Sequence, residues 1–264
     1  MGNNPEEYAQ NFRPHFEDGM GIYQTHAKES NDRLFVPLLK DMGRFFARFR
    51  IDRYENNQHS KFISRYAKRL REGRIILATL NYDCLLDIAL NKSVCRVAYP
   101  GLSGDVRILK VHGGCNLLLK TNGLVVKGDF VVTDGVFNAA VEVVPPEQVA
   151  TELDKRLAPP AMSLYARGKK VLFSPWIVDA MLKEFQESMN DAGLVVIVGV
   201  RPNPSDDHIW EHLARMKGRL ASVGNRQYYT EWTQANRNEM DNAWLGDRFI
   251  SSFDAICREI DEVL

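Results

Sequence analysis

IILATLNYD at residues 75–83 and ILKVHGG at residues 108–114 decide the fold expected for this chain. The first segment is apolar from Ile75 to Leu80 and then continues into Asn81, Tyr82 and Asp83, while the run 108–111 continues into His112. An apolar run of this length, followed at once by polar residues, is typical of a buried parallel strand that leads into a helix. The carboxyl ends of such strands face the ligand crevice of α/β proteins. We therefore expect an amide, a carboxylate and an imidazole at one edge of a parallel sheet.

The composition is that of an ordinary globular α/β chain. Of 264 residues, 45% are hydrophobic and 26% are charged, and the length allows one large domain with a substantial core. Lys plus Arg equals Asp plus Glu at 34 each, so bulk charge argues for neither nucleic acid nor a membrane as a partner. We interpret a local excess of basic residues between 44 and 74 as the solvated face of two helices, with an anionic partner as the alternative.

The four cysteines, Cys84, Cys95, Cys115 and Cys257, are widely spaced and form no CxxC pair. This usage fits a reducing cytosol and argues against a four-cysteine zinc ribbon, so we expect no zinc. No apolar stretch reaches the roughly 18 residues needed to cross a bilayer, and the polar N-terminus lacks a signal-peptide core. We therefore expect a cytoplasmic protein.

Hydrophobic periodicity predicts alternating strands and helices. Helical spacing occurs over residues 34–49, 62–70, 84–89, 147–157 and 176–189, and again from about 205 and in the tail up to 264. Strands are expected at 75–80, 94–97, 108–111 and 194–200, with a hairpin of 117–119 and 124–127. Such alternation implies a parallel sheet with right-handed crossovers. Apart from the short helix at 147–157, the proline-rich region 130–170 has no assignment.

Three segments resemble sirtuins. Thr79–Asp83 (TLNYD) resembles the T-x-N-x-D signature of sirtuins, especially as it occurs in the sirtuin-like NAD hydrolase domains of bacterial antiphage defence proteins. LKVHGG at residues 109–114 resembles the segment that carries the family's catalytic histidine. Leu194–Asp207 resembles the strand and loop that hold the nucleotide, and the three segments keep the family's order within about residues 16–260. The resemblance implies one sirtuin-like domain over 1–264. Its α/β fold would be a Rossmann-like parallel sheet flanked by helices, about 73–264, beside a small helical module, about 16–72.

The same resemblance implies hydrolysis of NAD, as substrate, to nicotinamide and ADP-ribose. The expected catalytic residues are Asn81, His112 and Asp83. An imidazole can accept a proton near neutral pH, and an amide can hold a water or a ribose hydroxyl by donating and accepting hydrogen bonds. The alternative for His112 is a structural histidine. Asn81 could instead cap a turn, and Asp83 could instead cap the following helix.

The expected cofactor-binding residues are Thr79, Gly113, Gly199, Arg201 and Asp207. Glycines at 113 and 199 would allow a ligand to approach the backbone closely. The resemblance places Asp206, Asp207 and His208 at the start of a helix after the nucleotide loop. Val200 and Arg201 replace the small hydroxyl residues usual in the family, so Arg201 would either pair with a phosphate or remain a surface arginine.

One family element is missing. The family begins with a strand and a Gly-Ala-Gly-x-Ser loop that binds the dinucleotide phosphates, and no such loop occurs here; Gly19 and Gly21 are the nearest candidates. Either the first βα unit is lost, or the coding sequence begins upstream, or another segment contacts the phosphates. The competing hypothesis is therefore a catalytically degenerate nucleotide-binding or scaffold protein. In either case we expect a partner defence protein or a homo-oligomer to complete the system.

A rival motif occurs at residues 208–212. His208, Glu211 and His212 form H-x-x-E-H, the inverted zinc-peptidase pattern, in which two histidines one helical turn apart bind zinc. Because the motif follows a proline-rich loop and few residues remain to provide a third ligand, we keep a zinc peptidase as the distant alternative.

Overall fold

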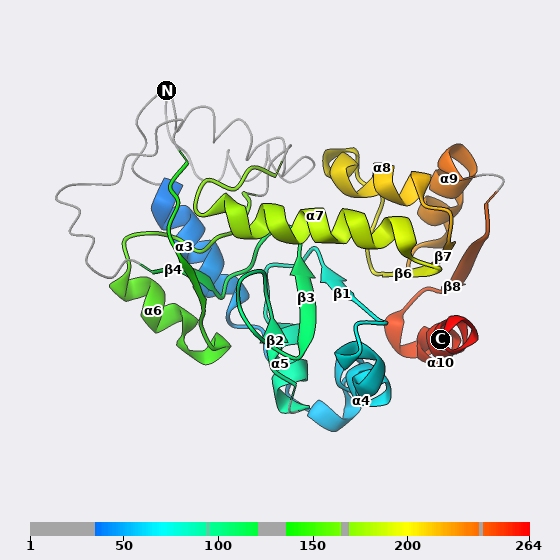
Figure 1. Ribbon diagram of the computed structural model, residues 1–264, viewed down its shortest axis with the longest axis horizontal. Helices are drawn as coiled ribbons and strands as arrows, with labels where there is room; N and C mark the ends of the chain where they lie inside the picture. Colours follow the sequence, from blue (N-terminus) through cyan, green and yellow to red (C-terminus); the bar gives the residue numbers. More distant parts are fainter. Residues whose placement is uncertain (1–34, 94, 121–135, 165–168, 238–239) are drawn as a thin grey trace, which may run out of the picture. The chain divides into compact units, whose positions relative to one another are not determined.

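The protein is described by a computed structural model that covers residues 35–93, 95–120, 136–164, 169–237 and 240–264 (Figure 1). The expected loop-like start at 1–15, the glycines at 19 and 21, and the expected strand at 124–127 lie outside these residues. Within the described residues, none of the helices has the length and apolar character needed to cross a membrane.

The chain divides into two compact units. The first contains the described residues up to Ile51 together with Ala78–Ile88 and Lys110–Leu182. The second contains Asp52–Leu77, Ala89–Leu109 and Lys183–Leu264. The two helices expected to form one module belong to different units, because α3 (Phe35–Phe46) precedes the first crossing at residue 51 and α4 (Gln58–Arg71) follows it.

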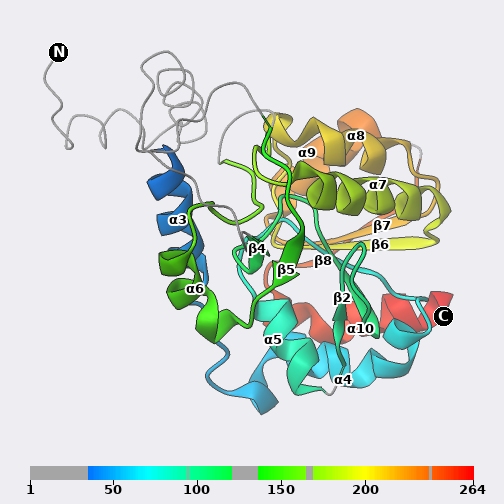
Figure 2. The ribbon, with the colours of Figure 1, turned by 60° about the vertical axis from the view of Figure 1, so that its left-hand side comes forward.

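The second unit is built on a parallel sheet in the order β6-β7-β8. Helices cover both faces, with α8 and α9 on one side and α10 on the other (Figure 2), and α10 also packs against α4. The apolar run in β6 explains its strand conformation beside the central strand β7; Ile197 is buried and the other residues of β6 are half-buried. The bounds are β6 Leu194–Val198, β7 Arg219–Val223, β8 Asn242–Gly246, α8 Asp207–Arg215, α9 Arg226–Asn236 and α10 Phe249–Val263.

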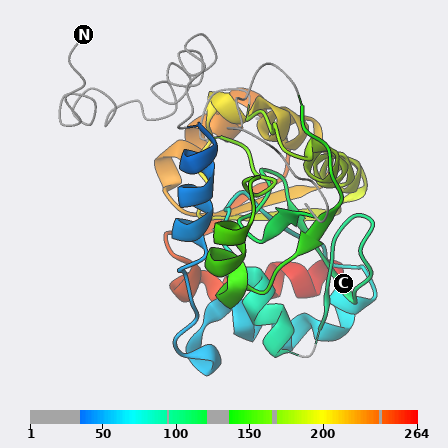
Figure 3. The same ribbon diagram turned by 90° about the vertical axis from the view of Figure 1, so that its left-hand side faces the viewer.

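In the first unit, α3 packs beside α6 (Val149–Lys155), as the blue and green helices of Figure 3 show. β4 (Leu117–Leu119) pairs antiparallel with β5 (Val141–Val143). A buried cluster that includes Cys84, Cys115 and Leu153 packs against this region. The first unit's core therefore lies around the segments that follow residues 83 and 114.

A third sheet carries the two segments singled out from the sequence. Its order is β1-β3-β2, formed by β1 (Leu77–Thr79), β3 (Val106–Lys110) and β2 (Val97–Ala98), with β2 and β3 parallel. The expected strands therefore exist and β1 neighbours β3. β1 is shorter than 75–80, with Leu77 and Thr79 half-buried and Ala78 exposed, which corrects the expectation of a buried strand. The remaining elements are η1 Tyr54–Asn56, α5 Leu85–Lys92, η2 Pro146–Gln148, α7 Pro175–Asp191 and η3 Pro204–Asp206.

The helices expected from periodicity are confirmed, with shifts of a few residues at their ends. The tail is the main error. We expected mixed helices after residue 205, but β7 and β8 lie between them because Arg219–Val223 and Asn242–Gly246 complete the hydrogen bonding of the β6 sheet. For β4, the described partner is β5, and the expected hairpin partner at 124–127 lies in the part that is not described.

Candidate functional site

The loop after β1 carries Asn81, Tyr82 and Asp83. The Thr79 hydroxyl oxygen accepts a hydrogen bond from the Asn81 N–H at 3.1 Å, so this predicted cofactor-binding residue also shapes the loop. Asn81 itself is exposed. The Asp83 carboxylate accepts from the Leu85 N–H at 2.9 Å, at the start of α5, which is the capping role left open by the sequence.

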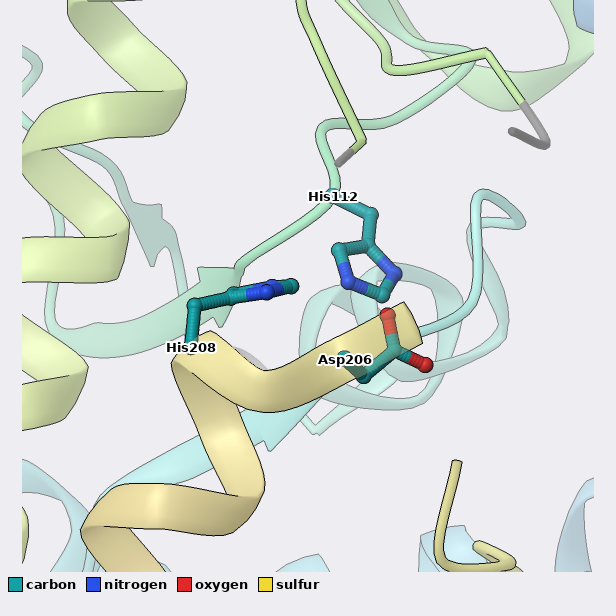
Figure 4. Close-up of side chains that lie close together, drawn as sticks. All are labelled: His112, Asp206 and His208. Atoms are coloured by element: carbon teal, nitrogen blue, oxygen red, sulfur yellow. The ribbon is translucent and has the colours of Figure 1, made fainter. Parts of the chain in front are cut away.

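The loop after β3 begins at His112, which is 4% exposed (Figure 4). The segment Ala161–Ser163 holds this loop through its backbone: the Ser163 N–H donates to the His112 carbonyl at 2.9 Å, and the Gly114 N–H donates to the Ala161 carbonyl at 3.1 Å. Gly113 has φ +81°, and a Cβ there would lie 2.2 Å from the Ala161 oxygen. The close approach that Gly113 permits is therefore made by the protein's own chain.

The two loops adjoin within the first unit. The Val111 N–H donates to the Thr79 carbonyl at 3.3 Å and the Cys115 N–H donates to the Tyr82 carbonyl at 2.8 Å. The Tyr82 ring is buried with its centroid 6.4 Å from that of His112, and its hydroxyl shares a 2.9 Å hydrogen bond with Ser163 Oγ. Because β1 and β3 are neighbouring strands, Asn81 and His112 follow adjacent strands, and Tyr82 contacts the loop of His112 through its carbonyl and its ring. The expectation that the side chains of Asn81 and His112 converge stays a prediction.

Sequence reasoning missed a buried polar network beneath these loops. The Lys110 side chain is fully buried, and its ammonium nitrogen lies 2.8 Å from Asp87 Oδ2. It donates to the Asp83 carbonyl and to Asn116 Oδ1, each at 2.9 Å, and Asn116 Nδ2 donates to Asp87 Oδ1 at 2.9 Å. A lysine inside an apolar strand was the available signal, because a buried ammonium requires anionic or carbonyl partners.

Two thiols flank the same network. Cys84 Sγ and Cys115 Sγ lie 3.4 Å apart, and both residues are buried. The hydrogen bond with Cys115, reinforced by burial, raises the pKa of the Cys84 thiol. Since the thiolate is the reactive form of cysteine, this pair suits packing rather than nucleophilic chemistry.

The predicted nucleotide residues of the second unit follow β6. Gly199 has φ +71°, and a Cβ added there would have no neighbouring atom within 4 Å, so the space beside its backbone is open. The Arg201 guanidinium lies 4.0 Å from the centroid of the Tyr228 ring, a cation–π contact at the surface. The Asp207 carboxylate is exposed and accepts from the His208 N–H at 2.7 Å.

Further residues that sequence reasoning missed lie at the same edge of this sheet. β7 ends before Gly224, whose N–H donates to the Gly246 carbonyl at the end of β8 at 2.8 Å. Asn225 then caps α9 by accepting from the Tyr228 N–H at 3.2 Å. Each of the strands β6, β7 and β8 is thus followed by, or ends in, a glycine. The dipeptides Val-Gly at 223–224 and Leu-Gly at 245–246 were the signal that could have located two further strand ends.

The zinc-peptidase motif lies on α8. Glu211 is exposed and forms an ion pair with Arg215 at 3.0 Å, and His208, Glu211 and His212 do not bring their ligand atoms together among the described residues. Asp206 and His208, drawn in Figure 4, have a carboxylate oxygen and a ring nitrogen within 4.8 Å of each other.

No family model, curated protein or solved structure matches this chain. The resemblance to sirtuins therefore rests on the sequence motifs at residues 79–83, 109–114 and 194–207 alone.

Proposed function

We propose that this chain is a sirtuin-like NAD hydrolase with a Rossmann-like fold, which cleaves the nicotinamide glycosidic bond to give nicotinamide and ADP-ribose. The observation that carries the proposal is the junction of two loops in the first unit. The loop with Asn81 and the loop with His112 are hydrogen-bonded to each other, which supports the proposal that their residues act together. A bacterial antiphage role, by depletion of NAD, belongs to the same proposal.

The chemistry assigned to each side chain follows from its type. Loss of nicotinamide leaves a sugar carbon with oxocarbenium character, which water must attack. The exposed Asn81 amide would hold the water or a ribose hydroxyl, and His112 would accept the released proton. Because Asp83 already caps α5, its share in the proposed reaction is to fix the loop. Thr79 in the first unit, and Gly199, Arg201 and Asp207 in the second, remain proposed contacts to NAD. Gly113 does not, because Ala161 and Met162 occupy the space beside its backbone.

Incubation of the purified chain with NAD tests the proposal. We expect release of nicotinamide and ADP-ribose in equal amounts, and loss of about 10²–10⁴-fold in turnover for His112→Asn if His112 is the general base. Asn81→Ala should also lose turnover, whereas Asn91→Ala, an exposed asparagine on α5, should not. Absence of turnover in the wild-type chain, or turnover that survives both substitutions, would refute the proposal.

A second candidate is a degenerate nucleotide-binding or scaffold protein. It is favoured by the contact at Gly113, where Ala161 and Met162 occupy the space beside the backbone, and by the lack of a Gly-Ala-Gly-x-Ser sequence. A ligand that binds only the folded state raises stability by about 2.7 kcal/mol at a hundred times its dissociation constant. A rise in melting temperature with ADP-ribose, without nicotinamide release from NAD, would select this candidate.

A further inference from the structure

We propose that Lys110, held by Asp87 and Asn116, is a positioning residue that fixes the loops after β1 and β3 in their mutual arrangement. The inference rests on the proposed function, because its purpose is to align Asn81 and His112 for the reaction. Lys110 does not touch the substrate in this scheme and acts only through the two loops.

The lysine ammonium is held by one ion pair, with Asp87, and by two hydrogen bonds that it donates to oxygens of Asp83 and Asn116. A lysine offers three N–H donors and no acceptor. Its nitrogen lies 2.8 Å from Asp87 Oδ2, 2.9 Å from the Asp83 carbonyl and 2.9 Å from Asn116 Oδ1. These three oxygens belong to α5, to the loop after β1 and to the loop after β3, so one cation connects three segments.

The neighbouring glycine leaves room for this arrangement. A Cβ at Gly114 would lie 2.7 Å from the Lys110 Cδ and 3.1 Å from its ammonium nitrogen. The second glycine of the HGG segment therefore makes space for the lysine stem. Asn116 closes the network because its amide donates to Asp87 while its oxygen accepts from Lys110.

Stability alone gives no reason to retain this network. Desolvation of a buried ion pair is costly, and apolar residues of similar size often replace such a pair with equal or greater stability. Apolar side chains cannot, however, hold a chosen carbonyl or amide oxygen at hydrogen-bond distance. What the network adds is the fixed position of the Asp83 carbonyl, two residues after Asn81, and of Asn116, four residues after His112.

The test compares Lys110→Met with the double variant Lys110→Met/Asp87→Leu. The single change leaves the Asp87 carboxylate buried without its cation, so its melting temperature should fall markedly. The double variant removes both charges, and its melting temperature should return towards that of the wild-type chain. We expect its kcat for nicotinamide release to stay about 100-fold low with KM little changed, since a displacement of about 1 Å can cost that much.

Backbone hydrogen exchange gives a readout that does not need turnover. In the double variant, the amides of residues 79–84 and 111–116 should exchange at least about tenfold faster, a loss of about 1.4 kcal/mol of local protection, while those of β4 and α6 keep wild-type rates. The control Arg156→Met removes ion pairs with Glu142 and Glu152 in the same unit and should leave both loops protected.

The outcomes separate the two proposals. If the wild-type chain releases no nicotinamide but the double variant loses protection in both loops, the proposed function fails and the positioning role stands. Wild-type protection of both loops in the double variant, or faster exchange with an unchanged kcat, overturns the positioning role. If the Lys110 variants do not fold, Asn116→Ala is measured in the same way with the same expected loss of protection. This change removes one acceptor for Lys110 and one donor to Asp87 but leaves the two charges paired.

Discussion

At Gly113 the backbone conformation and the packing both demand glycine. Its φ of +81° is disfavoured for residues with a Cβ, and the added atom would lie 2.2 Å from the Ala161 oxygen and 2.6 Å from the Met162 Cα. We predict that Gly113→Ala lowers the free energy of unfolding by roughly 3 kcal/mol, from strain and overpacking together. Gly73→Ala is the matched control: φ is +70° but no atom lies within 4 Å, so the cost should be about 1 kcal/mol. Urea denaturation of both variants measures the difference, and equal losses would contradict it.

Single residues were predictable where the signal was local. The capping role of Asp83 follows from a carboxylate placed just before a helical pattern, and the structure confirms it. For Lys110 the apolar run around it signals burial, but no local pattern shows which groups pair with the buried ammonium. Its partners, Asp87 and Asn116, are fixed only when α5 and the loop after β3 meet. The hydrogen bond from the Ser163 N–H to the His112 carbonyl likewise joins segments that are far apart in the sequence, so no local pattern predicts it.

At the scale of elements, the Asp261 carboxylate on α10 is one of the groups that join this helix to α4. Hydrogen bonds from Arg65 and then Tyr66 lower the pKa of Asp261. The pKa of Asp261 in the folded state is therefore below its unfolded value of about 3.9. The stability that the charged Asp261 contributes is present above the unfolded pKa and is lost as pH falls through the folded pKa. We predict that Asp261→Asn lowers the melting temperature at pH 7, and that its difference from the wild-type chain shrinks between pH 5 and about pH 3. The neighbouring Glu262→Gln should show no such convergence, and a difference that stays constant down to pH 3 would contradict the assignment.

Elements with their own periodic pattern were predictable, and those that depend on pairing were not. The helices α4, α7 and α10 show apolar residues three and four positions apart, so their existence follows from the sequence. In β7 and β8 arginine, serine, asparagine and glycine interrupt three apolar residues of five, and these strands form because β6 provides a partner for β7 and β7 for β8. Pairing with a neighbouring strand therefore decides the structure of these two segments, because their own preference for a strand is weak.

At the scale of the whole molecule, the chain crosses between the two units five times. Four of these crossings fall inside elements: β1, α5, β3 and α7 each give residues to both units. Helix α7 has 17 residues, and its division at residue 182 leaves two pieces shorter than the roughly 12–15 residues that an isolated helix needs. Neither unit can therefore keep all its elements when the other unfolds.

This sharing predicts that the chain unfolds in one cooperative step, although its length is above the range where that is the rule. Four buried free cysteines report the process, with Cys84 and Cys115 in the first unit and Cys95 and Cys257 in the second. The chain is equilibrated at a series of urea concentrations, exposed briefly to a thiol reagent, and digested for mass spectrometry of the cysteine peptides. All four cysteines should become labelled with the same midpoint urea concentration. A change confined to one unit, such as Gly113→Ala, should move that midpoint for the cysteines of both units by the same amount. Separate midpoints for the two pairs of cysteines, or a shift of the midpoint for only one pair, would contradict this prediction. Either result would mean that one unit can lose its structure while the other keeps it, so that the shared strands and helices do not couple the units.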